Sequence, residues 1–241
     1  MILSLDCSTL TLCLALLRAD GAVVEQRQVG PPQRQSEVLP GEIEKLLTAH
    51  GHTLKDVTGF VVGLGPGSFT GLRIALATMK GLAYALKVPL VGASSLAALA
   101  LEGPRDTELF ATAVVKKGEF YVRRVGADPL AEGDRPGEVS MTLAELADAL
   151  KRAPQARMIG PALTDWRAPL EALGVPAASF LAGPLVPSAV ALARLVTLPA
   201  AFDLAALFAL EPHYLRGSGA EENPKFPPLP GVEPKARLKE D

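Results

Sequence analysis

The sequence predicts an α/β protein of two lobes, each of about a hundred residues. Three observations support this prediction. Short apolar segments at the start of the chain have the pattern of an antiparallel meander, residues 59–86 have that of a strand, a glycine-rich loop and a helix, and the second half repeats the theme. A chain of 241 residues is long enough to bury a sizeable core.

Composition and charge narrow the function classes. Lys and Arg number 24 against 26 for Asp and Glu, so the net charge of -2 provides no strong field for nucleic acid or anionic membrane. Two cysteines, Cys7 and Cys13, are too few for a disulfide scaffold or a zinc ribbon, and we expect both to be small buried strand residues. The start of the chain has no basic region, and no apolar run reaches about 18 residues. We therefore expect a cytoplasmic protein with no membrane contact.

The first thirty residues predict three strands, Ile2–Asp6, Leu10–Leu17 and Val23–Val29, with a hairpin turn at Asp20-Gly21. A helix closed by Gly51 follows, and we expect Pro40 in its first turn because proline deeper in a helix breaks the ladder. Its apolar face is set by helical spacing and consists of Leu39, Ile43, Leu46, Leu47 and His50.

Residues 59–64 form the next expected strand, and the glycine-rich loop after it opens a helix that ends before Pro89. This helix has two apolar faces. One face consists of Leu72, Ala75, Leu76, Met79, Ala83 and Leu86. The other consists of the smaller residues Ile74, Ala77, Gly81 and Ala85. Two apolar faces need two partners, so the second face is either buried within its own chain, the commoner case, or docked on another chain.

The second half predicts a hairpin between 109–115 and 120–125, and a capping box of Thr142 and Glu145 that starts a helix. Residues 157–160 and 176–181 are short strand candidates, and residues 188–196 a further helix. From Arg216 onwards the chain is rich in proline and predicts a disordered tail.

The glycine loop and the end of the first strand are the candidate ligand site. A carboxylate and two hydroxyls at Asp6, Ser8 and Thr9 can lie near a cleft, and amides of Gly65, Gly67 and Ser68 at a helix N-terminus can hold phosphate. The loop is not a Walker loop, and a tight turn capped by Ser68 is the alternative that we favour.

Other chemistry finds little support in the sequence. The three histidines have no metal-binding spacing, and no nucleophile elbow occurs, so we expect no metal and no catalytic set. A small basic group, consisting of Lys116, Lys117, Arg123 and Arg124, can touch phosphate or be a solvated hairpin.

Five segments together resemble the bacterial TsaB (YeaZ) family, a subunit of the tRNA threonylcarbamoyladenosine machinery. In order they are residues 2–9, 35–40, 65–75, 117–121 and 212–216, of which 65–75 is the most specific. The resemblance covers residues 1 to about 216 and implies an actin-like (ASKHA, ribonuclease H-like) two-lobe fold, with a mixed sheet and flanking helices in each lobe. It suggests an N-terminal, partner-docking lobe at 1–101, a C-terminal lobe at 102–216 whose last helix can pack back on the first lobe, and the tail at 217–241.

The resemblance further implies a non-catalytic scaffold that stabilises and orients a TsaD-like subunit, which transfers threonylcarbamoyl to a tRNA adenosine beside the anticodon. It implies a TsaE-like ATPase as a further partner, a homodimer when the chain is alone, contact with tRNA only through the complex, and no cofactor. The expected partner interface consists of Ser36, Leu39, Ile43, Phe69, Leu72, Arg73, Ile74, Ala77 and Gly81.

The sequence departs from the family at two places. Gln35 stands where histidine is common, and Val114–Lys117 replaces an Asp-Ala-Arg-like run, changes that a scaffold tolerates better than an enzyme does. The alternative function is an ATP-dependent phosphotransferase or ATPase of the same fold, with Asp6 and the glycine loop at its phosphates. Such an enzyme needs more converging acidic residues than Asp6 alone.

Overall fold

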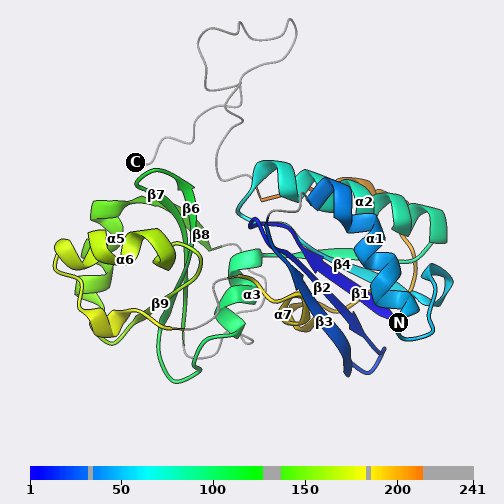
Figure 1. The fold of residues 1–241 in the computed structure, drawn as a ribbon, viewed down its shortest axis with the longest axis horizontal. Helices are drawn as coiled ribbons and strands as arrows, with labels where there is room; N and C mark the ends of the chain where they lie inside the picture. Colours follow the sequence, from blue (N-terminus) through cyan, green and yellow to red (C-terminus); the bar gives the residue numbers. More distant parts are fainter. Residues whose placement is uncertain (32–34, 127–136, 183–185, 214–241) are drawn as a thin grey trace, which may run out of the picture.

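A computed structural model describes residues 1–31, 35–126, 137–182 and 186–213. The described chain forms two lobes, each with one β-sheet and its own helices, and the helix α3 (Ser95–Leu101) lies between them (Figure 1). The predicted α/β two-lobe fold is thereby confirmed.

The first sheet has the strand order β3-β2-β1-β4-β5. Its strands are β1 (Ile2–Asp6), β2 (Leu12–Leu17), β3 (Val23–Val29), β4 (Gly59–Gly63) and β5 (Leu90–Ala93). The predicted meander is confirmed, since β1, β2 and β3 pair antiparallel, and β1, β4 and β5 pair in parallel. Leu10 was expected in β2 but lies in the preceding turn with 74% of its surface exposed.

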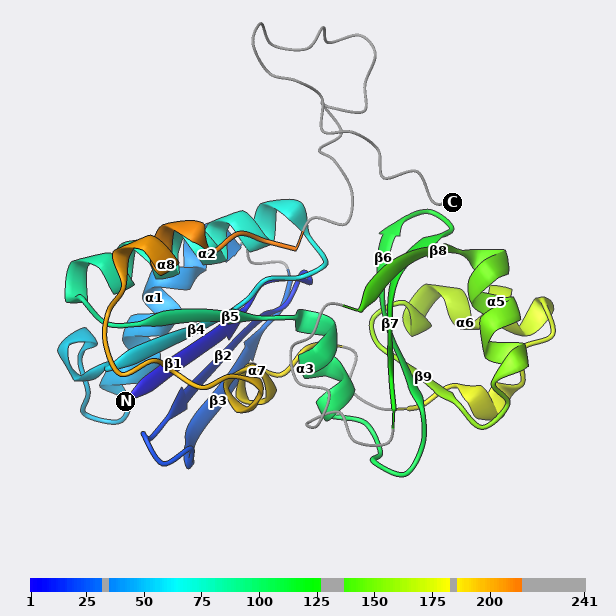
Figure 2. The ribbon, with the colours of Figure 1, turned by 180° about the vertical axis from the view of Figure 1, so that it is seen from behind.

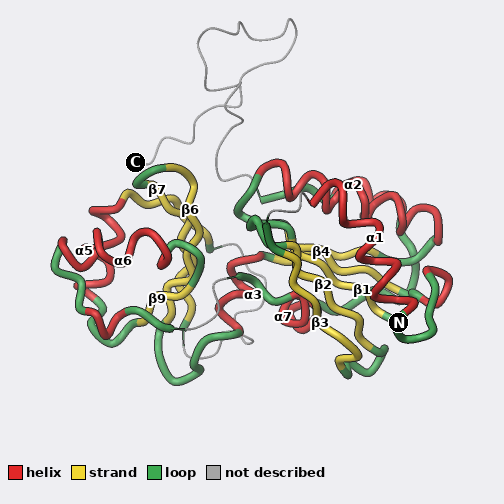
Figure 3. The backbone as a smooth tube through the Cα atoms, in the orientation of Figure 1, coloured by secondary structure: helices red, strands yellow, loops and turns green. Residues whose placement is uncertain are grey.

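Alternation along β2 gives the first sheet two apolar faces. Leu12, Leu14 and Leu16 belong to the core under the helices α1 (Gln35–Thr48) and α2 (Phe69–Leu86). The alternate residues Cys13, Ala15 and Leu17 are smaller on average than these three leucines. They pack under α7 (Ala189–Leu195) on the opposite face. Helices therefore cover both faces of this sheet (Figure 3).

The observed helix α1 differs from the expected one at two residues, Pro40 and His50. It begins at Gln35, so Pro40 lies in the second turn and the backbone loses one hydrogen bond there. His50 lies beyond the helix end at the surface, where its Nε2 is 2.6 Å from Glu25 Oε2. The four predicted apolar residues before His50 are buried.

The chain returns to the first lobe near its end. After α7, the helix α8 (Leu204–Ala209) lies against α2 (Figure 2), and its Leu207 enters the core of the first lobe. His213 closes the described chain, donating its backbone N–H to Leu64 O at 2.8 Å.

The second sheet, β8-β7-β6-β9, repeats the order of the first four strands of the first sheet. Its strands are β6 (Leu109–Lys116), β7 (Glu119–Val125), β8 (Glu138–Thr142) and β9 (Arg157–Ile159). Helices α5 (Leu143–Arg152) and α6 (Leu163–Ala172) pack on one face around Phe110 and Phe120. The predicted hairpin and capping box are both present.

The other face of the second sheet packs on α3, where Leu96 and Leu99 contact Leu109 and Ala111. Beside this contact, Arg123 of β7 pairs with Glu138 of β8 at 2.8 Å, and both side chains are only 4% exposed. Ser94, the N-cap of α3, also donates to Glu138 Oε1. A nearly buried polar group thus joins the two lobes.

For the second half of the chain, one expectation is wrong and another concerns residues that the structure does not describe. The strand predicted at 176–181 is wrong: a 3-10 turn, Ala177–Ser179, occupies it, and Phe180 makes one isolated bridge to Met158. A second 3-10 turn is Leu54–Asp56. The tail from Arg216 lies outside the described residues. Within the described ranges, no helix combines the length and apolar character needed to span a bilayer.

Candidate functional site

The carboxyl group of Asp6 is enclosed at the end of β1. Ser8 donates to its Oδ1 through the backbone N–H at 2.8 Å and through Oγ at 2.6 Å, and Ser95 Oγ donates to its Oδ2 at 2.5 Å. Asp6 has no exposed surface. Since both oxygens are engaged by neighbouring side chains, the carboxyl group links β1 to α3 and does not face a cleft.

The glycine loop packs directly on the residues after β1. A Cβ added to Gly67 would lie 2.2 Å from Ser8 O, and one added to Gly63 would lie 1.9 Å from Asp6 Oδ2. Gly65 donates its N–H to Ser95 Oγ at 3.0 Å, and Ser68 donates to Ser8 O at 2.7 Å. These contacts show why small residues are needed here, and they leave the amides of Gly65 and Ser68 already bonded within the chain.

The remaining nucleotide candidates also have structural partners. Ser68 caps α2 by accepting from Gly71 N–H at 3.2 Å. Thr9 accepts at its carbonyl oxygen from Gln35 Nε2 at 2.8 Å, so Gln35 ties the start of α1 to the loop after β1. Among the described residues, no group of three or more metal-ligating side chains comes together.

Burial raises the pKa of the Asp6 carboxyl group, although the hydrogen bonds from Ser8 and Ser95 oppose this. A group whose pKa is higher in the folded state favours folding below its unfolded pKa, and this contribution is lost as the pH rises through the folded pKa. We therefore expect the free energy of unfolding of the wild type, relative to Asp6→Asn, to fall as the pH rises above about 4.

Urea denaturation of both proteins between pH 4 and 7 measures this difference. Asp165→Asn, on the exposed surface of α6, is the matched control. A wild-type curve parallel to that of Asp6→Asn would contradict the expectation.

The expected basic hairpin does not form a positive patch. Arg123 is buried against Glu138, Arg124 Nη2 lies 2.6 Å from Glu108, and Lys116 Nζ lies 2.9 Å from Glu119. Acidic neighbours therefore neutralise three of the four cations in that group.

One face of α2 is exposed along its length, and we call it the α2 strip. It consists of Phe69, Arg73, Ala77, Gly81 and Tyr84. Phe69 is 41% and Tyr84 49% exposed, and the guanidinium of Arg73 lies 3.8 Å from the centre of the Phe69 ring. Burial of the small-residue face within its own chain, the commoner expectation, is thus wrong for Ala77, Gly81 and Ala85.

The structure divides the expected partner interface into two groups. Ser36 and four residues of the α2 strip are exposed, whereas Leu39, Ile43 and Leu72 lie in the core and are corrected to structural residues. Ile74 is half-buried against the same core, so its substitution affects folding as well as any interface. The α2 strip is therefore the better target for mutation.

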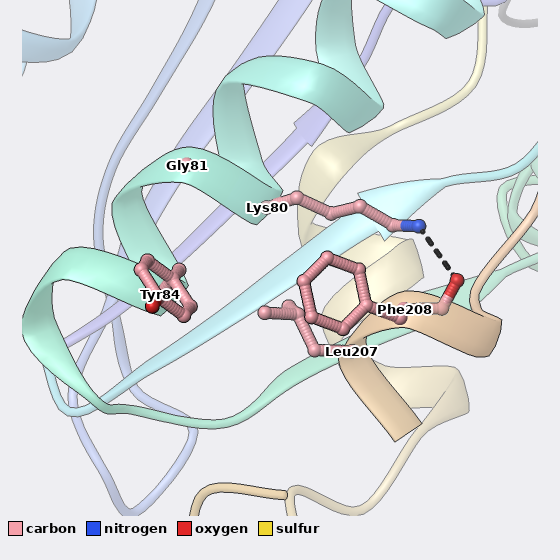
Figure 4. A pocket seen from close by; sticks show the side chains of 5 residues that line it. All are labelled: Lys80, Gly81, Tyr84, Leu207 and Phe208. Atoms are coloured by element: carbon pink, nitrogen blue, oxygen red, sulfur yellow. Dashed lines mark hydrogen bonds between the residues drawn. The ribbon is translucent and has the colours of Figure 1, made fainter. Parts of the chain in front are cut away.

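At the far end of the α2 strip, α8 forms one wall of an open apolar hollow of about 220 Å³. It is lined by Lys80, Gly81, Tyr84, Leu207 and Phe208 (Figure 4). Lys80 Nζ donates to Phe208 O at 3.1 Å, and the Phe208 ring is 65% exposed. Little in the sequence indicates this hollow, because α8 has six residues and meets α2 only in the fold.

Comparisons with known proteins agree with this architecture. A family model described as TsaD, tRNA N6-adenosine threonylcarbamoyltransferase, matches residues 32–116. Curated relatives named tRNA threonylcarbamoyladenosine biosynthesis protein TsaB include that of Escherichia coli K12, 33% identical over 123 residues, and that of Bacillus subtilis 168, 36% identical over 121 residues. Each alignment covers 50% of this chain and 52% of the relative, so the chain spans about half the length of these relatives.

The solved structure of YeaZ from Pseudomonas aeruginosa is 26% identical, with a TM-score of 0.65 over 80% of this chain and 89% of that one. Two sheets that share the order of four strands, flanked by helices and joined through α3, define a two-lobe α/β protein of the actin-like, ribonuclease H-like class. In sequence and in fold, the chain is similar to the TsaB (YeaZ) proteins.

Proposed function

We propose that this chain is a non-catalytic subunit in tRNA threonylcarbamoyladenosine biosynthesis, which holds a TsaD-like catalytic partner through the α2 strip. The observation that carries the proposal is the α2 strip itself, an exposed helical face with aromatic residues at its ends and Arg73 and two small residues between them. Aromatic and arginine side chains are enriched in interfaces, and small side chains allow a second helix to approach closely.

The region around Asp6 supports a scaffold over an enzyme. Its carboxyl group is enclosed, and the amides of Gly65 and Ser68, two of the loop amides that could bind phosphate, have partners within the chain. Phosphoryl transfer in well-studied enzymes relies on acidic residues and backbone amides that face the nucleotide and its metal ions. The catalytic step therefore belongs to the partner in this proposal.

The proposal extends to the assembly. The chain forms a homodimer through the same strip when the partner is absent, and a TsaE-like ATPase joins the pair. The tRNA contacts the chain only through the complex, in keeping with the balanced charge and the neutralised hairpin. We place the complex in the cytoplasm.

Ala77→Glu tests the docking surface. Ala77 lies exposed in the middle of the α2 strip, so the new carboxylate should leave the fold intact but would be desolvated and unpaired under a partner. We expect the dissociation constant for the TsaD homologue of the same cell to rise at least about 30-fold. Light scattering with size-exclusion chromatography, and calorimetry, measure the complex and its affinity.

Ala168→Glu is the matched control, since Ala168 is an exposed helical alanine of α6 in the other lobe. It should bind the partner as the wild type does. A folded Ala77→Glu chain with wild-type affinity would refute docking through the α2 strip. A nucleotide titration of the isolated chain belongs in the same experiment, because tight ATP binding would instead favour the phosphotransferase alternative.

A further inference from the structure

The second lobe contains a hollow of about 460 Å³ where the parallel strands β6 and β9 begin, and we call it the β6–β9 hollow. This volume is within the range of small-molecule sites, roughly 300–1,000 Å³. The lining residues are Pro104, Asp106, Thr107, Gln155, Arg157 and Leu181. Two apolar side chains, a cation, an anion and two neutral polar groups therefore surround one space.

Hydrogen bonds hold three segments of the chain around the β6–β9 hollow. Thr107 Oγ1 donates to Gln155 O at 2.6 Å, and the backbone N–H of Arg157 donates to Glu108 O at 2.8 Å. The backbone N–H of Leu181 donates to a carbonyl oxygen of β9 at 3.1 Å. The walls are therefore held together without a ligand, which lowers the entropy cost of binding one.

Arg157 presents a positioned guanidinium group with unused donors. Its Nη1 donates to the carbonyl oxygens of the three preceding residues at 3.4, 3.0 and 3.1 Å, which fixes one side of the group. Within the described part of the chain, neither Nε nor Nη2 of this half-buried side chain has a hydrogen-bond partner. These two atoms form an edge of the planar guanidinium that can bind both oxygens of a carboxylate.

Asp106 brings the opposite charge to the β6–β9 hollow without neutralising Arg157. Both side chains line the hollow, yet they do not form an ion pair with each other. Among the residues that the structure describes, the Asp106 carboxylate accepts no hydrogen bond and joins no ion pair. An unpaired cation and an unpaired anion around one space are complementary to a ligand that carries both charges.

We propose that the β6–β9 hollow binds an aliphatic α-amino acid. The carboxylate of the ligand accepts hydrogen bonds from Nε and Nη2 of Arg157. Its ammonium group lies at Asp106, with the hydroxyl oxygen of Thr107 as a second acceptor, and its side chain packs between Pro104 and Leu181. The site lies in the other lobe from α2 (Figure 1), so it does not depend on docking through the α2 strip.

Titration of the isolated full chain with L-leucine, followed by ¹⁵N–¹H correlation spectra, tests the site. We expect saturable shifts of the amides of Thr107, Arg157 and Leu181, with a dissociation constant of about 1 mM or tighter, and no shifts in α2. Isocaproate is the same ligand without the amine, and isoamylamine is the same ligand without the carboxyl group. Each should bind at least about tenfold more weakly, because each lacks one charged contact.

Two variants assign the charges to residues. Asp106→Asn, at an exposed side chain, should weaken L-leucine binding at least about tenfold and leave isocaproate binding unchanged. Arg157→Gln should weaken both L-leucine and isocaproate and leave isoamylamine binding unchanged. Asp165→Asn and Arg167→Gln, on the exposed surface of α6 in the same lobe, are the matched controls and should bind L-leucine as the wild type does.

Absence of saturable shifts in the wild type would overturn the proposal. Isocaproate that binds as tightly as L-leucine, or L-leucine binding that Asp106→Asn leaves unchanged, would overturn it as well, because neither result requires an ammonium group at Asp106. No TsaD homologue is present in these measurements. Failure of the amino-acid site would therefore leave the proposed function standing, and failure of docking through the α2 strip would leave the amino-acid site standing.

Discussion

Replacing Glu138 with alanine is expected to lower the free energy of unfolding by about 3–5 kcal/mol. Its carboxylate accepts hydrogen bonds from Arg123 and Ser94 between the two lobes, and the side chains of Glu138 and Arg123 are 4% exposed. Removing one member of a nearly buried ion pair leaves the charge of the other without its counterion. Urea denaturation at pH 7, followed by circular dichroism, measures the loss.

Glu108→Ala is the matched control, because Glu108 forms an ion pair with Arg124 at the surface of the same sheet, with exposures of 34% and 54%. Exposed pairs contribute about 0–1 kcal/mol, so this variant should remain close to the wild type. The double replacement Glu138→Leu with Arg123→Met should recover most of the lost stability. If Glu138→Ala costs less than about 1 kcal/mol, the pair does not hold the lobes together.

Gly71→Ala is expected to destabilise the protein by about 2 kcal/mol or more, although alanine is the better helix former. A Cβ at Gly71 would lie 2.2 Å from the carbonyl oxygen of Cys7 and 2.8 Å from Gln35 Oε1. The helix or the loop after β1 must move to accept it, and overpacking of this kind costs more than the gain in helix propensity. Thermal and urea denaturation provide the measurement.

Gly81→Ala in the same helix is the matched comparison. Its Cβ would meet nothing within 4 Å, so the substitution should stabilise the chain by about 0.5–1 kcal/mol. Opposite signs for two glycine-to-alanine changes ten residues apart are the expected result. Destabilisation of similar size at both positions would mean that the close approach at Gly71 does not decide the outcome.

Local patterns in the sequence were sufficient for the amphipathic elements. The meander of β1 to β3, the buried face of α1 and the hairpin of β6 and β7 each have a clear period, and the structure confirms them. Helix α3 carries no such pattern, since all seven of its residues are buried between the lobes. A helix surrounded by protein shows no polar face from which its orientation could be predicted.

The candidate site could likewise be predicted only as far as local sequence patterns allow. The sequence identified Asp6 and the glycine loop as one neighbourhood, and the structure brings them together. It could not show that Ser95, which lies 89 residues further along the chain, takes up the second carboxylate oxygen. The exposed face of α2 was visible as a second apolar stripe, but only packing could determine that Ile74 turns inward while Ala77 and Gly81 face outward.

The path of the chain also bears on how the protein folds during its synthesis. One apolar face of β2 is covered by α7, whose Ala189 and Val190 pack on it. These two residues follow the whole second lobe in the sequence. On the ribosome, the first sheet is therefore made early, with one apolar face that stays uncovered until α7 has emerged. Chains of this kind expose hydrophobic surface during translation, and the second lobe can fold as an insertion before the first lobe is complete.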